Sequence, residues 1–438
     1  MKEKIAFRDA QKECIDGQAL RKYQLERLKE TVGHALRTPF YQHRLNKVGI
    51  RSSDDIRSLK DLERIPFTTK DDLRESYPRG LLATDMKKVV RVHTSSGTTG
   101  IPTVIYHTQE DLDNWTELVV RSIVACGVTS DDVFQNMMTY GMFTGGLGLH
   151  YGAERLGALV IPSGSGNTKR QLQLMKDFRT TVVHATPSYM FHFSSKIGEL
   201  GFTVEELNLK KAFLGAEPYS ENTRKKIEEF FKIDVYNSYG LSEMNGPGVA
   251  FECIYKTGMH LWEDAYILEM IDPETKKNLG DDTQGELVLT TLCRQATPLL
   301  RYRTRDLTTV VKGNCPCGRT HRRISRIAGR TDDMLIISGV NVFPSQIEQV
   351  IMKIPEVGNN YQIYLAKEGA LDKLTVKVEL YSKLFSGDLQ DLERLKRKIQ
   401  DELRASIVIT PMVELHEPGS LPEFELKAKR VVDERIKI

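Results

Sequence analysis

A short loop rich in glycine and hydroxyl side chains is the first feature of the sequence that could do chemistry. It reads Thr94-Ser95-Ser96-Gly97-Thr98-Thr99-Gly100 and follows an apolar run that ends near His93. Small residues let backbone N–H groups turn inward and hydroxyls add donors, which is what a polyphosphate needs. The loop is not a Walker A motif, because its glycines are too close together and no lysine follows. A plain polar turn has a similar composition, so composition alone leaves both interpretations open.

A second set of residues has the chemistry of a metal site. Two thiols lie two positions apart at Cys315 and Cys317, and Cys253 lies seven positions before His260. Three cysteines and one histidine suit tetrahedral zinc with no open position, which favours a structural role over a catalytic one. Three unrelated thiols are the alternative. The remaining cysteines, which we expect to be packing residues, are Cys14, Cys126 and Cys293.

The elements that would position these residues alternate between helix and strand. Residues 13–36 have apolar positions at helical spacing, and Thr69 resembles a helix cap before 70–73. Beyond Val89 short apolar runs alternate with amphipathic stretches such as 221–231, which predicts an α/β unit with strands buried on both faces. The runs that we expect to be strands are 89–92, 158–161, 181–184 and 285–290.

A smaller α+β segment of about a hundred residues begins near Arg330, a common domain size. It contains an apolar run at 334–337, a helix near 345–354, a strand at 374–380 and a charged helix at 389–407. We therefore predict an α/β protein with a large N-terminal domain of several subdomains, residues 1–331, and a small mobile α+β domain, residues 332–438. No low-complexity linker separates them, which favours a short hinge.

Bulk properties exclude several classes. The 438 residues are 40% hydrophobic and 28% charged with a net charge of +3, and no basic stretch has interleaved aromatics, so we expect no nucleic-acid partner. The N-terminus lacks the apolar core of a signal peptide and no run of about 18 apolar residues occurs, so we expect no membrane span. Free cysteines then predict a cytoplasmic enzyme or binding protein.

Several segments in the correct order resemble one superfamily. Residues 95–103 look like the signature loop of the acyl-CoA synthetase and adenylation-domain superfamily, in its phenylacetate–CoA ligase branch. The resemblance runs from about residue 5 to the C-terminus, and the further matching segments are Pro66–Arg74, Tyr140–Gly148, Gly215–Pro218, Tyr239-Gly240-Leu241-Ser242-Glu243, Arg301–Asp306, Gly329–Met334 and Gly339–Glu348. It implies activation of a carboxylic acid by ATP to an acyl-adenylate, followed by transfer to the thiol of CoA.

The resemblance also implies roles for individual residues. Glu243 would hold Mg²⁺ and Tyr239 would stack on adenine, while Asp306 would accept hydrogen bonds from the ribose hydroxyls. Arg330 would approach the ribose and the α-phosphate. A surface ion pair among neighbouring arginines is the alternative for Asp306. Further residues of the ATP site would be Asn237, Gly240, Ser242, Ala216, Glu217 and Pro218.

Two lysines are implied to act on charge. Lys427 matches the late catalytic lysine of the family, although Leu426 stands where glycine is usual, and Lys429 competes for the role. The family usually has lysine where Ile101 stands, so Lys70 is the candidate that reaches the terminal phosphates. The small domain would rotate between the two steps about Asp332. The segment expected to line the CoA tunnel is Gly339-Val340-Asn341.

The acyl substrate rests on the branch that the chain resembles, which takes aryl acids such as phenylacetate. The residues that flank the acyl pocket would be Tyr140, Phe143, Gly145, Gly146 and Tyr236. Two other functions stay open: a nucleotidyl transferase of the same family that adenylylates a deazaflavin cofactor, and a degenerate nucleotide-binding homologue. We expect ATP, CoA and the acid as small-molecule partners, Mg²⁺ and zinc as metals, and leave a homodimer open.

Overall fold

The computed structural model describes residues 5–95, 101–337, 340–368, 371–381, 389–422 and 429–435. The chain folds into two compact units, each assembled from segments that are separate in sequence. Unit 1 comprises Met1–Gly164, Thr180–His184 and Tyr236–Ile327. Unit 2 comprises Ser165–Arg179, Ala185–Val235 and Ala328–Ile438. A domain boundary at residues 331/332 stays a prediction. Among the described residues, no helix combines the length and apolar character needed to cross a membrane.

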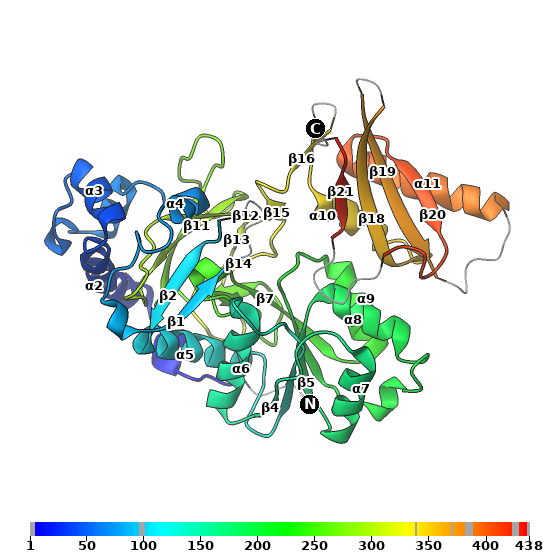
Figure 1. Cartoon of the computed structure of the whole chain (residues 1–438), viewed down its shortest axis with the longest axis horizontal. Coiled ribbons are helices and arrows are strands. Elements are labelled where there is room, and N and C mark those ends of the chain that lie inside the picture. The colour runs from blue at the N-terminus through cyan, green and yellow to red at the C-terminus, as the bar shows by residue number, and fades with distance from the viewer. Residues whose placement is uncertain are drawn as a thin grey trace. The chain divides into compact units, whose positions relative to one another are not determined.

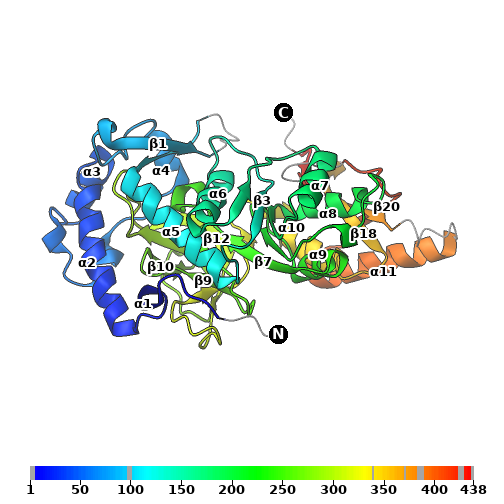
Figure 2. The ribbon, with the colours of Figure 1, turned by 90° about the horizontal axis from the view of Figure 1, so that it is seen from below.

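Unit 1 begins with helices and continues into strands (Figures 1 and 2). Its α5 and α6 lie side by side. Thr69 caps α4 in a capping box with Asp72, as the sequence predicts. The side chain of Asp16 caps α2 by accepting from the first backbone N–H groups. The helices are α1 (Ala10–Glu13), α2 (Gly17–Ala35), α3 (Pro39–Lys47), α4 (Lys70–Glu75), α5 (Gln109–Ala125) and α6 (Thr144–Leu156).

The strands of unit 1 form a hairpin and longer runs. The hairpin is antiparallel and joins β1 (Val89–Thr94) to β2 (Val104–Thr108). Strands β5-β3-β4 run parallel, whereas β13-β14-β9-β8-β7 and β10-β11-β12 are antiparallel. Their bounds are β3 (Val133–Asn136), β4 (Leu159–Ile161), β5 (Val182–Ala185), β7 (Asp234–Tyr239), β8 (Ala250–Phe251), β9 (Met259–Leu261), β10 (Tyr266–Ile271), β11 (Gly285–Thr291), β12 (Tyr302–Thr308), β13 (Val310–Val311) and β14 (Arg323–Ile324).

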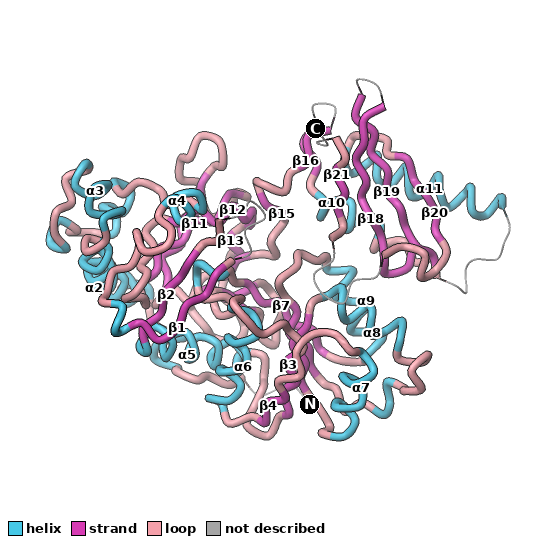
Figure 3. Tube along the Cα trace, viewed as in Figure 1, coloured by secondary structure: helices cyan, strands magenta, loops and turns pink. Residues whose placement is uncertain are grey.

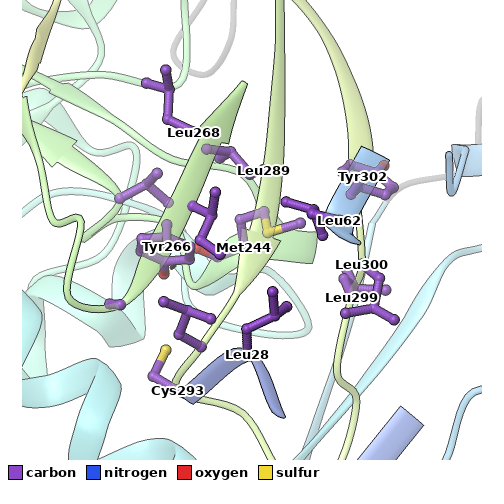
Figure 4. Packing of buried hydrophobic residues seen from close by; sticks show 14 of the residues in the cluster. Leu28, Leu62, Met244, Tyr266, Leu268, Leu289, Cys293, Leu299, Leu300 and Tyr302 are labelled. Atoms are coloured by element: carbon purple, nitrogen blue, oxygen red, sulfur yellow. Dashed lines mark hydrogen bonds between the residues drawn. The ribbon is translucent and has the colours of Figure 1, made fainter. Parts of the chain in front are cut away.

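The main core of unit 1 lies between the N-terminal helices and β10-β11-β12 (Figure 4). Leu28 of α2 and Leu289 of β11 are fully buried in it, together with Tyr266 of β10. Met244, which follows directly after Glu243, packs into the same cluster. The residue after a predicted site residue is therefore held by the core, which fixes the backbone at that point.

Unit 2 has a sheet of its own (Figure 3). The order is β20-β19-β18-β21, and both α10 and α11 contribute apolar side chains to the core on this sheet. That core extends from Ile337 to Val413, so the C-terminal residues have a hydrophobic cluster independent of unit 1. The elements are α7 (Thr168–Asp177), α8 (Pro187–Lys196), α9 (Glu221–Phe231), α10 (Pro344–Ile351), α11 (Leu389–Ile407), β6 (Lys211–Leu214), β15 (Gly329–Arg330), β16 (Leu335–Ile337), β17 (Val340–Val342), β18 (Val357–Glu368), β19 (Leu371–Leu380), β20 (Met412–His416) and β21 (Val431–Asp433).

Candidate functional site

The β1–β2 hairpin carries the predicted phosphate loop. Thr94 pairs with Val104 at the end of the hairpin, and the backbone N–H of Ser95 donates to the carbonyl of Thr103 over 3.2 Å. The two strands thus hold both ends of the loop together. The loop residues that lie outside the described part of the chain are Ser96, Gly97, Thr98, Thr99 and Gly100.

A chain of hydroxyls joins this hairpin to the predicted magnesium ligand. The hydroxyl of Thr103 donates to Oε1 of Glu243 over 3.1 Å, and Ser95 Oγ lies 2.6 Å from Thr103 Oγ1. Because the proton of Thr103 goes to the carboxylate, Ser95 is the donor of the shorter bond. Glu243 and Thr103 are both buried. The carboxylate is therefore held at the base of the predicted phosphate loop.

An arginine that sequence analysis missed supports the turn around Glu243. The guanidinium of Arg294, 2% exposed, donates to the Glu243 carbonyl over 2.6 Å and through Nε to Asn245 Oδ1 over 2.8 Å. Ser242, in the short 3-10 turn Ser242–Met244, lies 3.3 Å from the hydroxyl of Thr144 through its own Oγ. The hydrogen bonds of the Arg294 guanidinium are buried and charge-assisted, so they fix the backbone around Glu243 strongly.

Tyr239 and Asp306 meet inside unit 1. The hydroxyl of Tyr239, at the end of β7, donates to Oδ2 of Asp306, in β12, over 2.6 Å. Both residues are more than 90% buried, so the alternative of a surface ion pair for Asp306 is wrong. Its neighbours Arg301 and Arg303 pair instead with Glu269 and Glu286. The tyrosine thus orients the carboxylate that the family resemblance assigns to the ribose.

Close backbone approach explains the glycine after Tyr239. A Cβ on Gly240 would lie 2.5 Å from the Cα of Gly246, which no real Cβ tolerates. Asn237, two residues before Tyr239, donates its backbone N–H to Oε2 of buried Glu252 over 2.8 Å. The close approach of Gly246 to Gly240 and the hydrogen bond of Asn237 therefore fix the backbone on both sides of Tyr239.

The predicted acyl-pocket residues differ in burial. Phe143 is 44% exposed at the cap of α6, whereas Tyr236 is buried beneath the ammonium of Lys256. Tyr140 is half-buried, and its hydroxyl lies 3.1 Å from Nδ1 of His150. Burial raises the pKa of Tyr140 to about 12, so it stays a neutral phenol at physiological pH.

Two glycines begin α6. A Cβ on Gly146 would lie 2.7 Å from the carbonyl of Thr139, so only glycine fits there. A Cβ on Gly145 would make only an ordinary contact with Met138. The side chain of Asn136 donates to the Gly146 carbonyl over 2.6 Å, which holds the start of α6 against the end of β3.

The hairpin and the predicted acyl segment share one carbonyl. The Met142 carbonyl accepts from the Thr94 N–H and from Nδ1 of buried His93, each over 3.0 Å. Because a carbonyl only accepts, Nδ1 of His93 carries its proton.

Lys70 begins α4 directly after Thr68 and Thr69, and the backbone of Thr68 bonds to that of Arg301 and Arg303. The segment that contains Lys70 therefore lies beside β12, the strand that carries Asp306.

Unit 2 contains the predicted residues 216–218. Ala216 adopts a left-handed backbone with φ +65, and the carboxylate of Glu217 accepts from both the N–H and the hydroxyl of Ser188. Glu217 and Pro218 line a cavity of about 660 Å³ within this unit, together with Asp332 and Lys429. Four predicted residues are thus brought to one cavity.

Arg330 and Asp332 form a bidentate ion pair. Nε and Nη2 of Arg330 donate to the two carboxylate oxygens of Asp332 over 2.9 and 3.1 Å. Asp332, the residue implied to be the hinge, is therefore bonded to Arg330, the residue implied to approach the ribose. Val340 and Asn341 lie on β17, where Asn341 is exposed opposite Ile336. Gly339 and Lys427 fall outside the described residues, whereas Lys429 is exposed.

The four predicted metal ligands come together in unit 1. The ligand atoms of Cys253, His260, Cys315 and Cys317 all lie within 4.8 Å of one another, and all four side chains are buried. Sγ of Cys253 lies 3.6 Å from that of Cys315, and Cys317 Sγ lies 3.3 Å from Nε2 of His260. Zinc–ligand bonds of 2.0–2.3 Å imply ligand separations of about 3.3–3.8 Å in a tetrahedron. The donor set and its spacing therefore fit a closed tetrahedral site.

The cysteine loop also anchors the N-terminal segment. Arg319, two residues after Cys317, donates through Nε to Oε2 of Glu13 over 2.8 Å, and both side chains are buried. Oε1 of Glu13 accepts from the backbone N–H groups of Arg8 and Asp9. Of the other cysteines, Cys126 and Cys293 are buried as expected for packing residues, and Cys14 is only half-buried.

Comparison with known proteins gives a consistent result. Residues 42–293 match the model of the AMP-binding enzyme family, and residues 339–435 match that of the AMP-binding enzyme C-terminal domain. This chain belongs to the AMP-binding enzyme family. The first match contains Glu243 and Tyr239, and the second contains Lys427, while Asp306 and Arg330 fall between the two matched ranges.

Relatives of this AMP-binding enzyme cover almost the whole chain. A phenylacetate–coenzyme A ligase of Thermus thermophilus is 45% identical, with 97% of this chain and 98% of the relative covered. One of Escherichia coli is 43% identical over 95% of each. A crystal structure of 2-hydroxyisobutyryl-CoA ligase in the postadenylation state, with an acyl-AMP bound, is 27% identical with a TM-score of 0.91, covering 98% of this chain and 92% of that one. The predicted fold, a large α/β part followed by a small C-terminal domain, is thereby confirmed.

Proposed function

We propose that this protein is an ATP-dependent phenylacetate–CoA ligase that forms an acyl-adenylate and then acyl-CoA, with release of pyrophosphate and AMP. The observation that carries the proposal is the buried carboxylate of Glu243, bonded through Thr103 to the base of the predicted phosphate loop. It is supported by relatives named phenylacetate–coenzyme A ligase at 43–45% identity over at least 95% of the chain.

The first half-reaction joins two anions, so it needs charge neutralisation and alignment. Glu243 is our proposed ligand of Mg²⁺, which would neutralise phosphate charge when bound; a single carboxylate with waters is usual for this ion. Ser95 and the loop 96–100 would bind phosphate oxygens. Lys70 is our candidate cation for the terminal phosphates, because Ile101 leaves the loop without one.

Adenosine recognition is proposed for the residues that the family resemblance implies. In unit 1 the pair of Tyr239 and Asp306 would contact the adenine and the ribose, with the carboxylate pre-oriented by the phenol. In unit 2 the residues would be 216–218, with Arg330 directed at the ribose and α-phosphate. Contact of the ribose or the α-phosphate with Nε and Nη2 of Arg330 would require its release from Asp332, since that carboxylate accepts from both nitrogens.

The second half-reaction transfers the acyl group from AMP to the thiol of CoA. We propose that Lys427 stabilises the charge of the adenylation transition state, and that the C-terminal domain, with its boundary at residues 331/332, turns about Asp332 to present Gly339-Val340-Asn341 to CoA. The independent core of residues 337–413 supports a part that moves as one body.

We propose zinc for the cluster of three cysteines and one histidine. All four positions of a tetrahedron would be filled by protein, which leaves no place for substrate and makes the ion structural. Nε2 of His260 lies 3.3 Å from Sγ of Cys317, so Nε2 is the nitrogen that faces the other ligands.

The test is a panel of carboxylic acids assayed for AMP formation with ATP and CoA. Phenylacetate or a close aryl acid is expected among the best substrates, with AMP release that depends on CoA. Activity confined to short aliphatic acids would reject the aryl assignment. Turnover independent of CoA would favour the nucleotidyl transferase, and no pyrophosphate release with any acid would favour the degenerate homologue.

Lys427 has a matched control two residues away. Lys427→Ala should slow adenylation by about a hundredfold or more, in the range of other lost transition-state charges, yet leave CoA transfer from preformed phenylacetyl-AMP intact. Lys429→Ala should change neither step. The reverse pattern would assign the role to Lys429, and equal loss of both steps would reject it for Lys427.

A further inference from the structure

A second cavity of unit 2 has no role in the proposed reaction. It measures about 660 Å³, within the range of small-molecule sites. Its walls come from α8 and α9 on one side and from β18, β19 and residues 418–419 on the other. We name it the α8–α9 cavity. It shares Ser188, Phe191 and Arg430 with the cavity that holds Glu217 and Asp332, so the two adjoin.

Two cations that line the α8–α9 cavity have no carboxylate partner among the described residues. Nζ of Lys226 donates to the Val357 carbonyl over 3.2 Å, and Nη1 of Arg430 donates to Asn360 Oδ1 and the Tyr361 carbonyl over 2.7 and 3.1 Å. Within the described part of the chain neither has a carboxylate oxygen within 4 Å. Burial lowers the pKa of Lys226 to about 8, the sign of a cation whose lost hydration is not replaced by an anion.

The carboxylates of the same cavity are already engaged. Glu199 pairs with Lys196 over 3.1 Å. Glu379 accepts from the side chain of Asn360 over 3.2 Å and from the backbone N–H of Leu421 over 2.7 Å. The groups that donate to Glu379 are neutral, so its charge remains; Lys196, Lys226 and Arg430 against Glu199 and Glu379 still leave one positive charge in excess, and an anion entering the cavity would meet Lys226 and Arg430.

The remaining wall is aromatic. Phe191 of α8, Phe230 and Phe231 of α9, and Tyr381 after β19 all line the cavity. Phe230 is 42% and Tyr381 37% exposed, so apolar surface faces open space. The ring of Tyr381 lies 5.6 Å from Nζ of Lys226, which puts the aromatic surface beside the cation. A ligand that suits both features has a flat apolar body and one anionic group.

We propose that the α8–α9 cavity is a second binding site for an aromatic carboxylate, with its carboxylate at Lys226 and Arg430 and its ring among the aromatic side chains. None of the residues predicted for the acyl pocket lines this cavity. The choice of phenylacetate as the probe rests on the proposed function, whereas the site itself rests on the aromatic wall and on two cations that form no ion pair within 4 Å among the described residues.

Occupancy of this site would stabilise the arrangement of unit 2. The two walls belong to segments distant in sequence, joined also by Glu348, whose Oε1 accepts from the hydroxyl of Thr223 over 2.7 Å. A ligand that contacts both walls binds only when they face each other, and so favours that state by its binding free energy. At high concentration an aryl acid should therefore slow any step that requires β18 and β19 to leave α8 and α9.

The experiment is calorimetric titration of the full chain with sodium phenylacetate after saturation with the acyl-adenylate mimic phenylacetyl-sulfamoyl-adenosine. One further phenylacetate per chain is expected. Lys226→Met should weaken it by about tenfold or more, as loss of a charged partner does, while Lys225→Met, an exposed neighbour on α9, should leave it within about twofold. Lys226→Arg should restore binding.

No further binding to the saturated enzyme, or equal affinity in Lys226→Met and wild type, would overturn the proposal. If Lys226→Met does not fold, Tyr381→Ala tests the aromatic wall in its place, and unchanged affinity there is equally decisive. The titration needs no turnover. Failure of the mimic to bind would count against the proposed substrate, and the component that depends on Lys226 would still be measurable.

Discussion

Replacing Thr103 with valine removes one hydroxyl from the chain of Ser95, Thr103 and Glu243 and preserves the shape of the side chain. Oε1 of Glu243 then loses a donor at 3.1 Å in a buried site, and Ser95 loses the acceptor at 2.6 Å. A hydrogen bond to a charged group contributes about 1.5–3 kcal/mol. We take this free energy to hold Glu243 in its metal-binding position. Its loss then lowers the rate tenfold for each 1.36 kcal/mol.

Thr103→Val should accordingly lower kcat/KM for ATP by between about tenfold and a hundredfold and raise the Mg²⁺ concentration needed for half-maximal rate. The assay is pyrophosphate exchange with phenylacetate across a magnesium series. Thr116→Val is the matched control, because among the described residues its hydroxyl bonds only to the Leu112 carbonyl in its own helix. An ATP and magnesium dependence of Thr103→Val within twofold of wild type would refute the assigned contact.

Three other outcomes are expected. Tyr239→Phe removes the donor to Asp306 and should raise KM for ATP by about tenfold without unfolding the chain; an unchanged KM would mean that the phenol does not orient the carboxylate. Cys315→Ser should abolish the bound metal, about one zinc per chain in wild type, and lower Tm by several degrees, whereas an equal metal content in both would reject the cluster as its site. Burial lowers the pKa of His184 from 6.5 to about 3, so the stability that its neutral form contributes is complete above pH 6.5 and is lost as the pH falls toward 3. His184→Gln should reduce the difference in unfolding free energy between pH 8 and pH 5 by about 2 kcal/mol, measured by urea titration. An undiminished difference would contradict the pKa shift.

Local patterns predicted the elements that depend on local forces. The expected helices at 221–231 and 389–407 coincide with α9 and α11, since both have apolar residues at strict helical spacing. The cysteines and histidine were found by their residue types, which have few other uses in that combination. The strand β18, adjacent to β19 in the sheet, was not predicted: Tyr361, Ile363 and Leu365 alternate in the core, but Gly358, Asn359 and Asn360 follow its first residue, and these residue types indicate a turn.

Contacts between distant residues were beyond sequence reasoning. Thr103 and Glu243 are separated by 140 positions, and Arg294 reaches the Glu243 turn from 51 positions away. Thr103 and Glu243 each stand in a segment that resembles the family, but Arg294 stands in none, and one sequence does not reveal which buried polar groups become partners. The role of Tyr239 was incomplete for the same reason: its ring was assigned from the family, but its hydroxyl bond to Asp306 depends on how β7 and β12 meet.

The bond between Glu13 and Arg319 has a consequence for the order of folding during synthesis. These residues are 306 positions apart, so the carboxylate of Glu13 has no charged partner until most of the chain has left the ribosome. An unpaired carboxylate is expensive to bury, which keeps the first turn of the chain in water until the cysteine loop arrives. The N-terminal segment is therefore expected to pack only after the cysteine loop has folded. Protease resistance near Arg8 should appear late in translation and require the metal-binding cysteines.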